Sequence, residues 1–100
     1  MIPDSVRMIG QAAFYGCSKL EVVLVGNSIE KIGANAFCNC VKLDRIYCKD
    51  SPEEWKEVSI DSEGNDIFIN ATRYYYRESE PIDTEYKYWY YDDNGNPLRW

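Results

Sequence analysis

A 23-residue repeat is the feature of this sequence that most constrains its fold. When residues 2–24 are placed on residues 25–47, identical residues recur along the alignment and the remaining apolar positions exchange similar side chains. The identical pairs are Ser5 and Ser28, Ile9-Gly10 and Ile32-Gly33, Ala13-Phe14 and Ala36-Phe37, Cys17 and Cys40, and Lys19-Leu20 and Lys42-Leu43. A fixed period of this length indicates a solenoid, in which each repeat packs against its neighbours.

The end of each repeat has the sequence of a β-strand. Residues 20–25 and 43–48 are rich in β-branched and large apolar side chains, which favour strands. Because successive repeats stack in a solenoid, we expect the two strands to lie side by side and parallel.

A single helical turn is expected over residues 12–15 and again over residues 34–38, with a phenylalanine from each turn filling the core. Gly16 and Asn39 then occupy the same repeat position. Both residue types tolerate the left-handed backbone that ends a helical turn, so we expect that conformation at both.

The repeat is expected to stop at Cys48 and to be followed by a capping helix. Ser51-Pro52-Glu53-Glu54 combines a serine cap, a proline at the first helical position and a glutamate at the third. The helix should continue towards residues 58–59, with Trp55 covering the open end of the second coil. Residues 61–66 are expected to form a polar loop.

An aromatic, strand-rich segment follows. Residues 67–69 lead into a strand candidate over residues 71–77, and Asn94-Gly95 predicts a two-residue hairpin turn between residues 86–92 and 96–100. In that register Tyr91 faces Leu98 and Trp89 faces Trp100. Trp89, Tyr91, Leu98 and Trp100 would then share one face, with Tyr88, Tyr90 and Arg99 on the other.

The composition argues against several classes of function. A net charge of −6 disfavours nucleic acid and anionic membrane surfaces, which need clustered Lys and Arg. The sequence has no His and no glycine-rich phosphate loop, so we expect no enzyme activity. Its four cysteines lack the spacing of a zinc site, and we interpret them as free thiols rather than metal ligands or disulfides, with no cofactor.

The first residues begin inside a repeat and do not resemble a signal peptide. We therefore expect an open N-terminal end, where Ile2, Val6, Ile9 and Phe14 are exposed to further repeats or to a second copy of the chain.

The spacing Ile-Pro-x-Ser-Val-x-x-Ile-Gly-x-x-Ala-Phe-x-x-Cys-x-x-Leu, found over residues 2–20 and again with changes to Leu43, closely resembles the BspA-type (Treponema pallidum-type) leucine-rich repeat. The tail is similar to one that follows the last such repeat, through Glu53-Glu54-Trp55, residues 71–76 and the Trp89–Trp100 hairpin. The resemblance implies an α/β fold: a short leucine-rich-repeat solenoid with a capping helix and a C-terminal antiparallel β-hairpin or sheet. We divide the chain into repeats (1–48), helix and loop (49–66) and aromatic strands (67–100), within one structural domain.

The resemblance also implies a non-catalytic protein-binding or adhesion module of a bacterial surface or secreted protein. Contacts are expected on the strand side and on a face of Tyr and Arg residues; the candidates are Glu21, Asp44 and Arg45, and Tyr74, Tyr76, Tyr88, Tyr90, Arg73 and Arg99. Two alternatives remain open: the tail aromatics bind a carbohydrate or cell-wall ligand, or they form a structural cap without a ligand.

Overall fold

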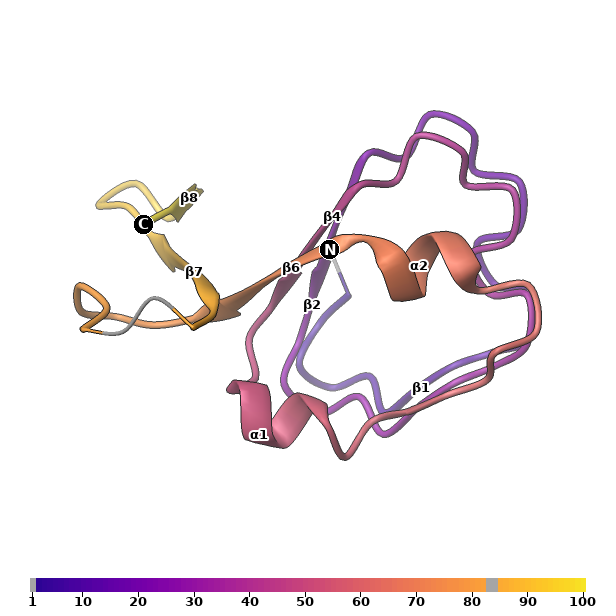
Figure 1. Cartoon of the computed structure of the whole chain (residues 1–100), viewed down its shortest axis with the longest axis horizontal. Coiled ribbons are helices and arrows are strands. Elements are labelled where there is room, and N and C mark those ends of the chain that lie inside the picture. The colour runs from indigo at the N-terminus through magenta and orange to yellow at the C-terminus, as the bar shows by residue number, and fades with distance from the viewer. Residues whose placement is uncertain (1, 83–84) are drawn as a thin grey trace.

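The computed structural model describes residues 2–82 and 85–100. These residues form eight strands and two short helices, which precede and follow β5, and Figure 1 shows successive coils lying over one another with β7 and β8 to one side. The elements are β1 (Met8–Ile9), β2 (Val22–Val25), β3 (Lys31–Ile32), β4 (Arg45–Cys48), α1 (Pro52–Trp55), β5 (Ser59–Ile60), α2 (Asp66–Asn70), β6 (Thr72–Tyr76), β7 (Lys87–Tyr91) and β8 (Pro97–Arg99).

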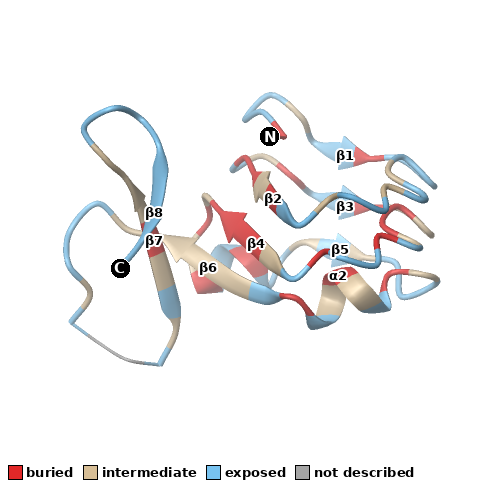
Figure 2. Ribbon diagram, turned by 90° about the horizontal axis from the view of Figure 1, so that it is seen from above, coloured by how far each residue is buried: buried red, intermediate tan, exposed pale blue. Residues whose placement is uncertain are grey.

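Two parallel ladders confirm the predicted solenoid. A small sheet has the order β1-β3-β5, and a larger sheet has the order β2-β4-β6-β7-β8 (Figure 2). Met8 pairs with Lys31 and Val22 pairs with Arg45, so the register follows the sequence repeat. We call the turns of the solenoid coil 1 (β1 and β2), coil 2 (β3 and β4) and coil 3 (β5 and β6).

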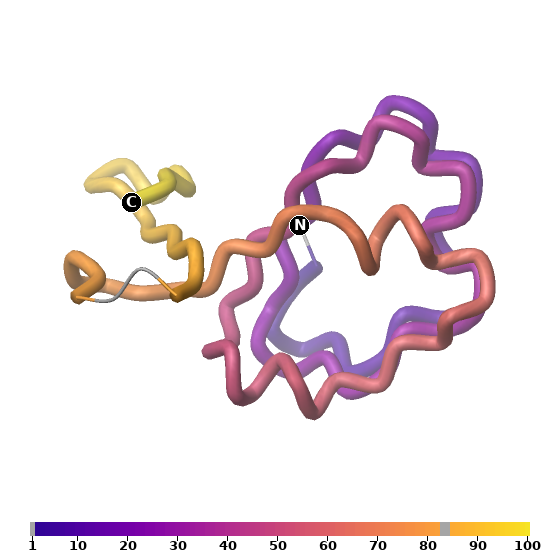
Figure 3. The backbone as a smooth tube through the Cα atoms, viewed as in Figure 1, coloured from indigo at the N-terminus to yellow at the C-terminus, as the bar shows by residue number. Residues whose placement is uncertain are grey.

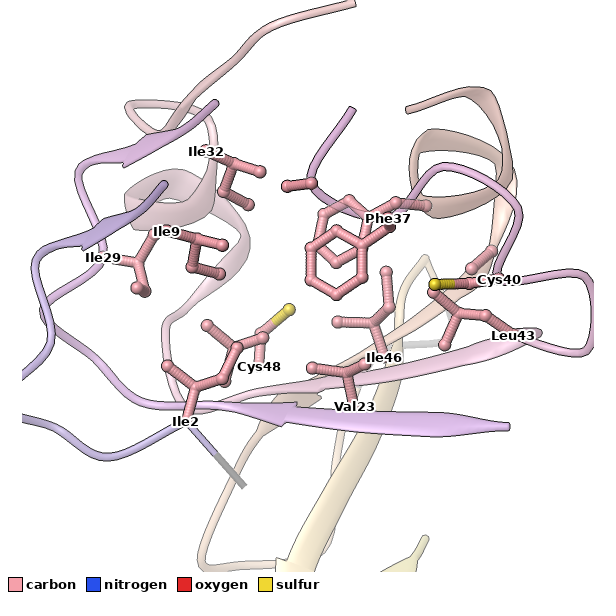
Figure 4. Close-up of a cluster of buried hydrophobic side chains, with 14 of the residues drawn as sticks. Ile2, Ile9, Val23, Ile29, Ile32, Phe37, Cys40, Leu43, Ile46 and Cys48 are labelled. Carbon is pink, nitrogen blue, oxygen red and sulfur yellow. The ribbon is translucent and has the colours of Figure 1, made fainter. Parts of the chain in front are cut away.

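The core lies inside the coils and is built from equivalent positions of neighbouring repeats (Figure 4). A column of stacked rings runs along it, with Phe37 centred 5.3 Å from Phe14 and 4.4 Å from Phe68. Phe37 and Phe68 are fully buried, whereas Phe14 at the end of the column is partly buried. Because equivalent residues of neighbouring coils pack on one another, the three coils form one continuous core.

The prediction that coiling ends at Cys48 is wrong. β5 pairs with β3 and β6 pairs with β4, both in parallel, so a third coil continues both ladders. Coil 3 is longer than the first two, because Arg45 pairs with Thr72. The identity of the repeat is lost in coil 3, but Phe68 still supplies the ring that packs on Phe37.

The helix prediction is confirmed at its start and wrong at its end. Ser51 Oγ accepts the Glu54 N–H at 3.2 Å and Glu54 Oε1 accepts the Ser51 N–H at 2.9 Å, which is a complete capping box. However, α1 ends at Trp55. Residues 59–60 form β5, because their backbone pairs with β3 and continues the small parallel sheet into coil 3. Trp55 is buried inside coil 3, with its ring 6.3 Å from that of Phe68, rather than over the end of coil 2. Residues 66–70, expected as loop and strand, form α2.

The left-handed positions are confirmed at Gly16 (φ 75°) and Asn39 (φ 62°). Ala12 and Asn35 are also left-handed, at φ 58° and 59°. The expected helical turns are instead series of tight turns. In coil 1 alternate N–H groups point along the solenoid, as Gly16 N–H does in donating to Cys38 O at 2.8 Å, and those between them donate within the coil, as Tyr15 N–H does to Ala12 O at 3.1 Å. The backbone ladder between coils thus replaces hydrogen bonds that a helix would make within itself.

The hairpin is antiparallel as predicted, but its register is wrong by one residue. Trp89 pairs with Arg99 and Tyr91 with Pro97, because the loop contains three residues rather than two. Asp92 N–H donates to Asn96 O at 2.8 Å and Gly95 is left-handed at φ 80°, which fits a three-residue loop closed by glycine. The shift moves Leu98 and Trp100 to the face of Tyr88 and Tyr90, and it moves Arg99, expected on that face, to the face of Trp89. β6 also pairs with β7 in parallel, so the antiparallel part of this sheet is the β7–β8 pair.

The expected exposure at the N-terminal end is wrong for Ile2 and Ile9, which are buried, whereas Val6 and Phe14 are partly buried. Ile2 bridges Val25 in parallel, accepting the Gly26 N–H at 2.8 Å and donating to Leu24 O at 2.8 Å. This pairing seats Ile2 against the core beside β2.

Candidate functional site

The C-terminal hairpin is anchored outside the coils by Trp89. Figure 3 shows residues 77–82 and 85–100, coloured orange to yellow, lying outside the coils. The Trp89 side chain is fully buried, its ring stacks on Tyr47 at 5.6 Å, and its indole N–H donates to Cys48 O at 2.8 Å. A large ring whose single polar group is satisfied holds the hairpin firmly against β4.

Tyr76 belongs to this anchor. Its ring lies 5.1 Å from Trp89 and 5.9 Å from Tyr91, and its hydroxyl donates to Glu78 at 3.4 Å. Burial and the neighbouring Glu78 raise the pKa of the Tyr76 hydroxyl. The structure therefore places this predicted contact residue in the packing between β6 and β7.

A pocket of about 650 Å³ gathers three of the predicted residues, Tyr74, Tyr88 and Arg99. The Arg99 guanidinium lies 5.8 Å from the centre of the Tyr74 ring, and its Nη1 donates to the Tyr74 hydroxyl at 3.4 Å. This hydrogen bond raises the pKa of Arg99. The contacts with Tyr74 thus hold the positively charged guanidinium of Arg99 at the pocket.

Trp100 forms another wall of the pocket and is rigidly held although it is exposed. Its ring lies 4.2 Å from Tyr90, and its indole N–H donates to Arg77 O at 2.9 Å. Arg77 in turn lies over the Tyr88 ring at 5.9 Å. Tyr90 therefore packs on Trp100 and does not itself line the pocket.

Sequence reasoning missed five residues that line this pocket: Glu80, Pro81, Tyr86, Lys87 and Trp100. Trp100 was placed on the wrong face by the hairpin register. Tyr86 lies two residues before Tyr88, the spacing of side chains on one face of a strand, and this pattern could have identified it. Glu80 and Pro81 lie in the connection between β6 and β7, whose course no pattern in the sequence predicts. We define the aromatic surface as Tyr74, Tyr86, Tyr88, Arg99 and Trp100.

Arg73 lies apart from the aromatic surface. It pairs in register with the buried Ile46, and its guanidinium lies 5.8 Å from the centre of the Trp55 ring in coil 3. Its Nε is buried and has no hydrogen-bond partner among the described residues. The alternation of side chains along β6 turns Arg73 towards the core side of the sheet, away from Tyr74.

The strand-side candidates lie at the entrance to β2 and β4. Asp44 N–H donates to Glu21 O at 3.1 Å, which places these two residues on neighbouring coils. Arg45 Nε lies 3.3 Å from Asp44 Oδ1. None of the three lines the aromatic pocket, so they form a separate polar area.

The four cysteines are free thiols. Burial raises the pKa of the Cys40 and Cys48 thiols, so both remain protonated at neutral pH. Over residues 2–82 and 85–100, no three His, Cys, Asp or Glu side chains are grouped so that they could hold a metal ion.

In the same described ranges, no helix has the length and apolar character needed to cross a membrane.

Comparison with known proteins agrees with the architecture. Residues 1–75 match the family model described as a BspA type leucine-rich repeat region of six copies. The match extends beyond the point where repeat identity is lost and ends within β6, the last strand of coil 3. No curated protein and no solved structure matched the chain. The chain belongs to the BspA-type leucine-rich repeat family.

Proposed function

We propose that the chain is a non-catalytic module that binds a protein partner through the aromatic surface. The observation that carries the proposal is the pocket at which Tyr74, Tyr88 and Arg99 meet the exposed Trp100. Tyr, Trp and Arg are the residue types most enriched at binding hot spots. Membership of a repeat family that is typically non-catalytic and commonly binds proteins supports the same interpretation.

The rigidity of the aromatic surface favours binding. Trp100 is hydrogen-bonded to the backbone, Arg99 is held over Tyr74, and Trp89 fixes the hairpin beneath them. Side chains that are already ordered lose less conformational entropy when a partner binds. We assign Glu21, Asp44 and Arg45 to a secondary contact area that adjusts charge complementarity.

We extend the proposal to location and role. Proteins of this repeat family are often surface-associated, so we propose that the module contributes to adhesion at the bacterial cell surface or in secreted form.

The test is an NMR titration of the isotope-labelled chain with purified host and bacterial surface proteins. We expect one or more partners to shift amides of β6, β7 and β8, and Trp100→Ala and Arg99→Ala each to weaken that binding by about tenfold or more. Lys19→Ala is the matched control, because Lys19 is exposed and does not line the aromatic pocket. Shifts confined to other surfaces would contradict the proposal.

Carbohydrate binding is the second candidate, favoured by the tyrosine and tryptophan rings that wall the pocket, since sugar rings stack on such surfaces. Trp55 and Trp89 are buried, so a soluble glycan should quench mainly the fluorescence of Trp100. Quenching that disappears in Trp100→Phe would favour a glycan ligand. No response to glycans or proteins at this surface would leave a purely structural cap as the account of the tail.

A further inference from the structure

A column of polar residues runs along one corner of the solenoid, with one member in each coil. Asp4, Asn27 and Asp50 occupy equivalent repeat positions. Asp4 is fully paired, because its Oδ1 accepts the Asn27 N–H at 3.1 Å and its Oδ2 accepts a hydrogen bond from Lys49 Nζ at 2.8 Å. These contacts hold the pKa of the Asp4 carboxyl below its ordinary value.

Asp50 has the same position but no such partners. It is 4 % exposed, and its carboxylate has no hydrogen bond or ion pair with any described residue. Lys49, which precedes Asp50 in the sequence, is engaged by Asp4. A buried carboxylate is normally paired, so an unpaired one is a candidate to accept hydrogen bonds from a cationic group.

The Asp50 side chain lies against a pocket of about 360 Å³. Asn27, Ser28, Glu30 and Glu54 also line this pocket, and the Ser28 hydroxyl donates to Asn27 Oδ1 at 3.4 Å. One oxygen of Glu54 is used by the capping box, where it accepts the Ser51 N–H, and the other has no partner among the described residues. The pocket is therefore lined by three carboxylate side chains, of which Asp50 has no partner among the described residues and Glu54 keeps one unpartnered oxygen.

The charges that surround Asp50 are mostly negative. Glu54 and Glu30 line its pocket and Asp4 lies nearby, whereas the cations are Lys49, paired with Asp4, and Arg7 at the rim. Arg7 lies 3.9 Å from Glu30 in an exposed ion pair, which contributes little to stability. Burial, and then the charges of Glu54 and Asp4, raise the pKa of Asp50 to about 6, so a bound cation would relieve this repulsion at neutral pH.

We propose that the Asp50 pocket binds an ammonium or guanidinium group, supplied by a lysine or arginine side chain of a protein or by a free polyamine. Such a group carries several N–H donors and can be bound by one or two carboxylates, which Asp50 and Glu54 supply at this pocket. A divalent metal ion fits less well, since calcium takes six or more oxygens and the described residues hold no cluster of three metal-binding side chains. The site is distinct from the aromatic surface, with which it shares no lining residue.

The test is an NMR titration of the whole chain at pH 7.5 and matched ionic strength, with three probes: a tetralysine peptide, spermidine and calcium chloride. We expect tetralysine or spermidine to shift the amides of residues 27–28 and 50–54 saturably. Asp50→Asn should weaken this binding by at least about tenfold, the loss expected for a charge-assisted hydrogen bond. Glu57→Gln is the matched control, because it removes the same charge from an exposed position outside the pocket.

The outcomes separate the sources. Response to tetralysine alone assigns the site to a protein side chain, and response to spermidine as well assigns it to the cationic group itself. Equal binding by Asp50→Asn, equal loss in Glu57→Gln, or shifts with calcium alone would overturn the proposal. Because these residues lie outside the aromatic surface, a failure here leaves the proposed function untouched.

Discussion

Coils 1 and 2 are built from two copies of one sequence, whereas coil 3 is built from a sequence that keeps almost none of it. The ladders nevertheless run without interruption from β1 through β3 to β5 and from β2 through β4 to β6. A solenoid coil therefore needs the backbone ladder and a ring to fill the core, and it does not need the repeat sequence itself.

Asn65 shows how coil 3 manages without the repeat. In coils 1 and 2, the N–H of Phe14 donates to the Ala36 carbonyl at 2.8 Å. In the next step, Phe37 N–H donates instead to the side-chain oxygen of Asn65 at 3.1 Å, and the Asn65 amide donates to Gly33 O and Asp61 O at 3.0 and 2.7 Å. The fully buried Asn65 side chain thus replaces the backbone carbonyl that accepts this hydrogen bond in the first step of the ladder.

The largest expected effect separates the middle of the ring column from its end. Phe37→Ala should lower the free energy of unfolding by about 3–5 kcal/mol, because it opens a cavity between two stacked rings. Phe14→Ala should cost about half as much, since Phe14 is only partly buried. Urea denaturation measures both, and equal losses would mean that coil 1 is packed as tightly as coil 2.

Asn65→Ala tests the junction between the repeated and the unrepeated coils. It leaves Phe37 N–H, Gly33 O and Asp61 O without their partner, and we expect a loss of about 2–3 kcal/mol. Asn70→Ala, at an exposed position in the same helix, is the control and should change stability little. A loss in Asn65→Ala no larger than in the control would contradict the role given to Asn65.

Two left-handed glycines offer a matched pair. Gly16→Ala should cost about 1 kcal/mol from backbone strain alone, because a Cβ there meets no neighbour. Gly64→Ala carries the same strain, and its Cβ would also overlap Asn35 Oδ1 of coil 2, so we expect about 2 kcal/mol. Chemical denaturation of the two variants should show this difference, and its absence would mean that coils 2 and 3 are less closely packed there.

Asp50→Asn should stabilise the chain by about 1–2 kcal/mol at pH 7.5 in the absence of a ligand. The folded pKa of about 6 lies above the ordinary value of 3.8, so the folded state binds the proton more tightly than the unfolded state does. Ionised Asp50 therefore costs stability above pH 6, and this cost disappears as the pH falls towards 4. Denaturation at both pH values should show the gain at pH 7.5 alone; a gain that persists at pH 4 would contradict the assignment.

Repetition explains which parts of the fold the sequence could predict. Gly16 and Asn39, or Phe14 and Phe37, could be identified because each position was seen twice, and the capping box at Ser51 is a local signal. Coil 3 has no second copy, and α2 and β5 are held by partners in coil 2 that local propensity does not reveal.

The candidate site was predicted in part for the same reason. Tyr74, Tyr88 and Arg99 follow from aromatic and charge patterns, and they do meet at one pocket. Trp100 was misplaced because a three-residue loop and a two-residue turn differ by one residue, which reverses every side chain beyond the turn. No pattern in the sequence identifies Asp50 as a buried residue, because its burial depends on the packing of coil 3 beneath coil 2.

The most direct test of the account is native-state amide hydrogen exchange, read at the hydrogen-bonded amides of β4 and β6. If coil 3 is an integral part of the solenoid, the amides of both strands should exchange with similar free energies of opening, and Asn65→Ala should lower both together. Amides of β6 that exchange at the rate of an unfolded segment, while those of β4 remain protected, would contradict it. Coils 1 and 2 would then be the folded unit and coil 3 an appendage.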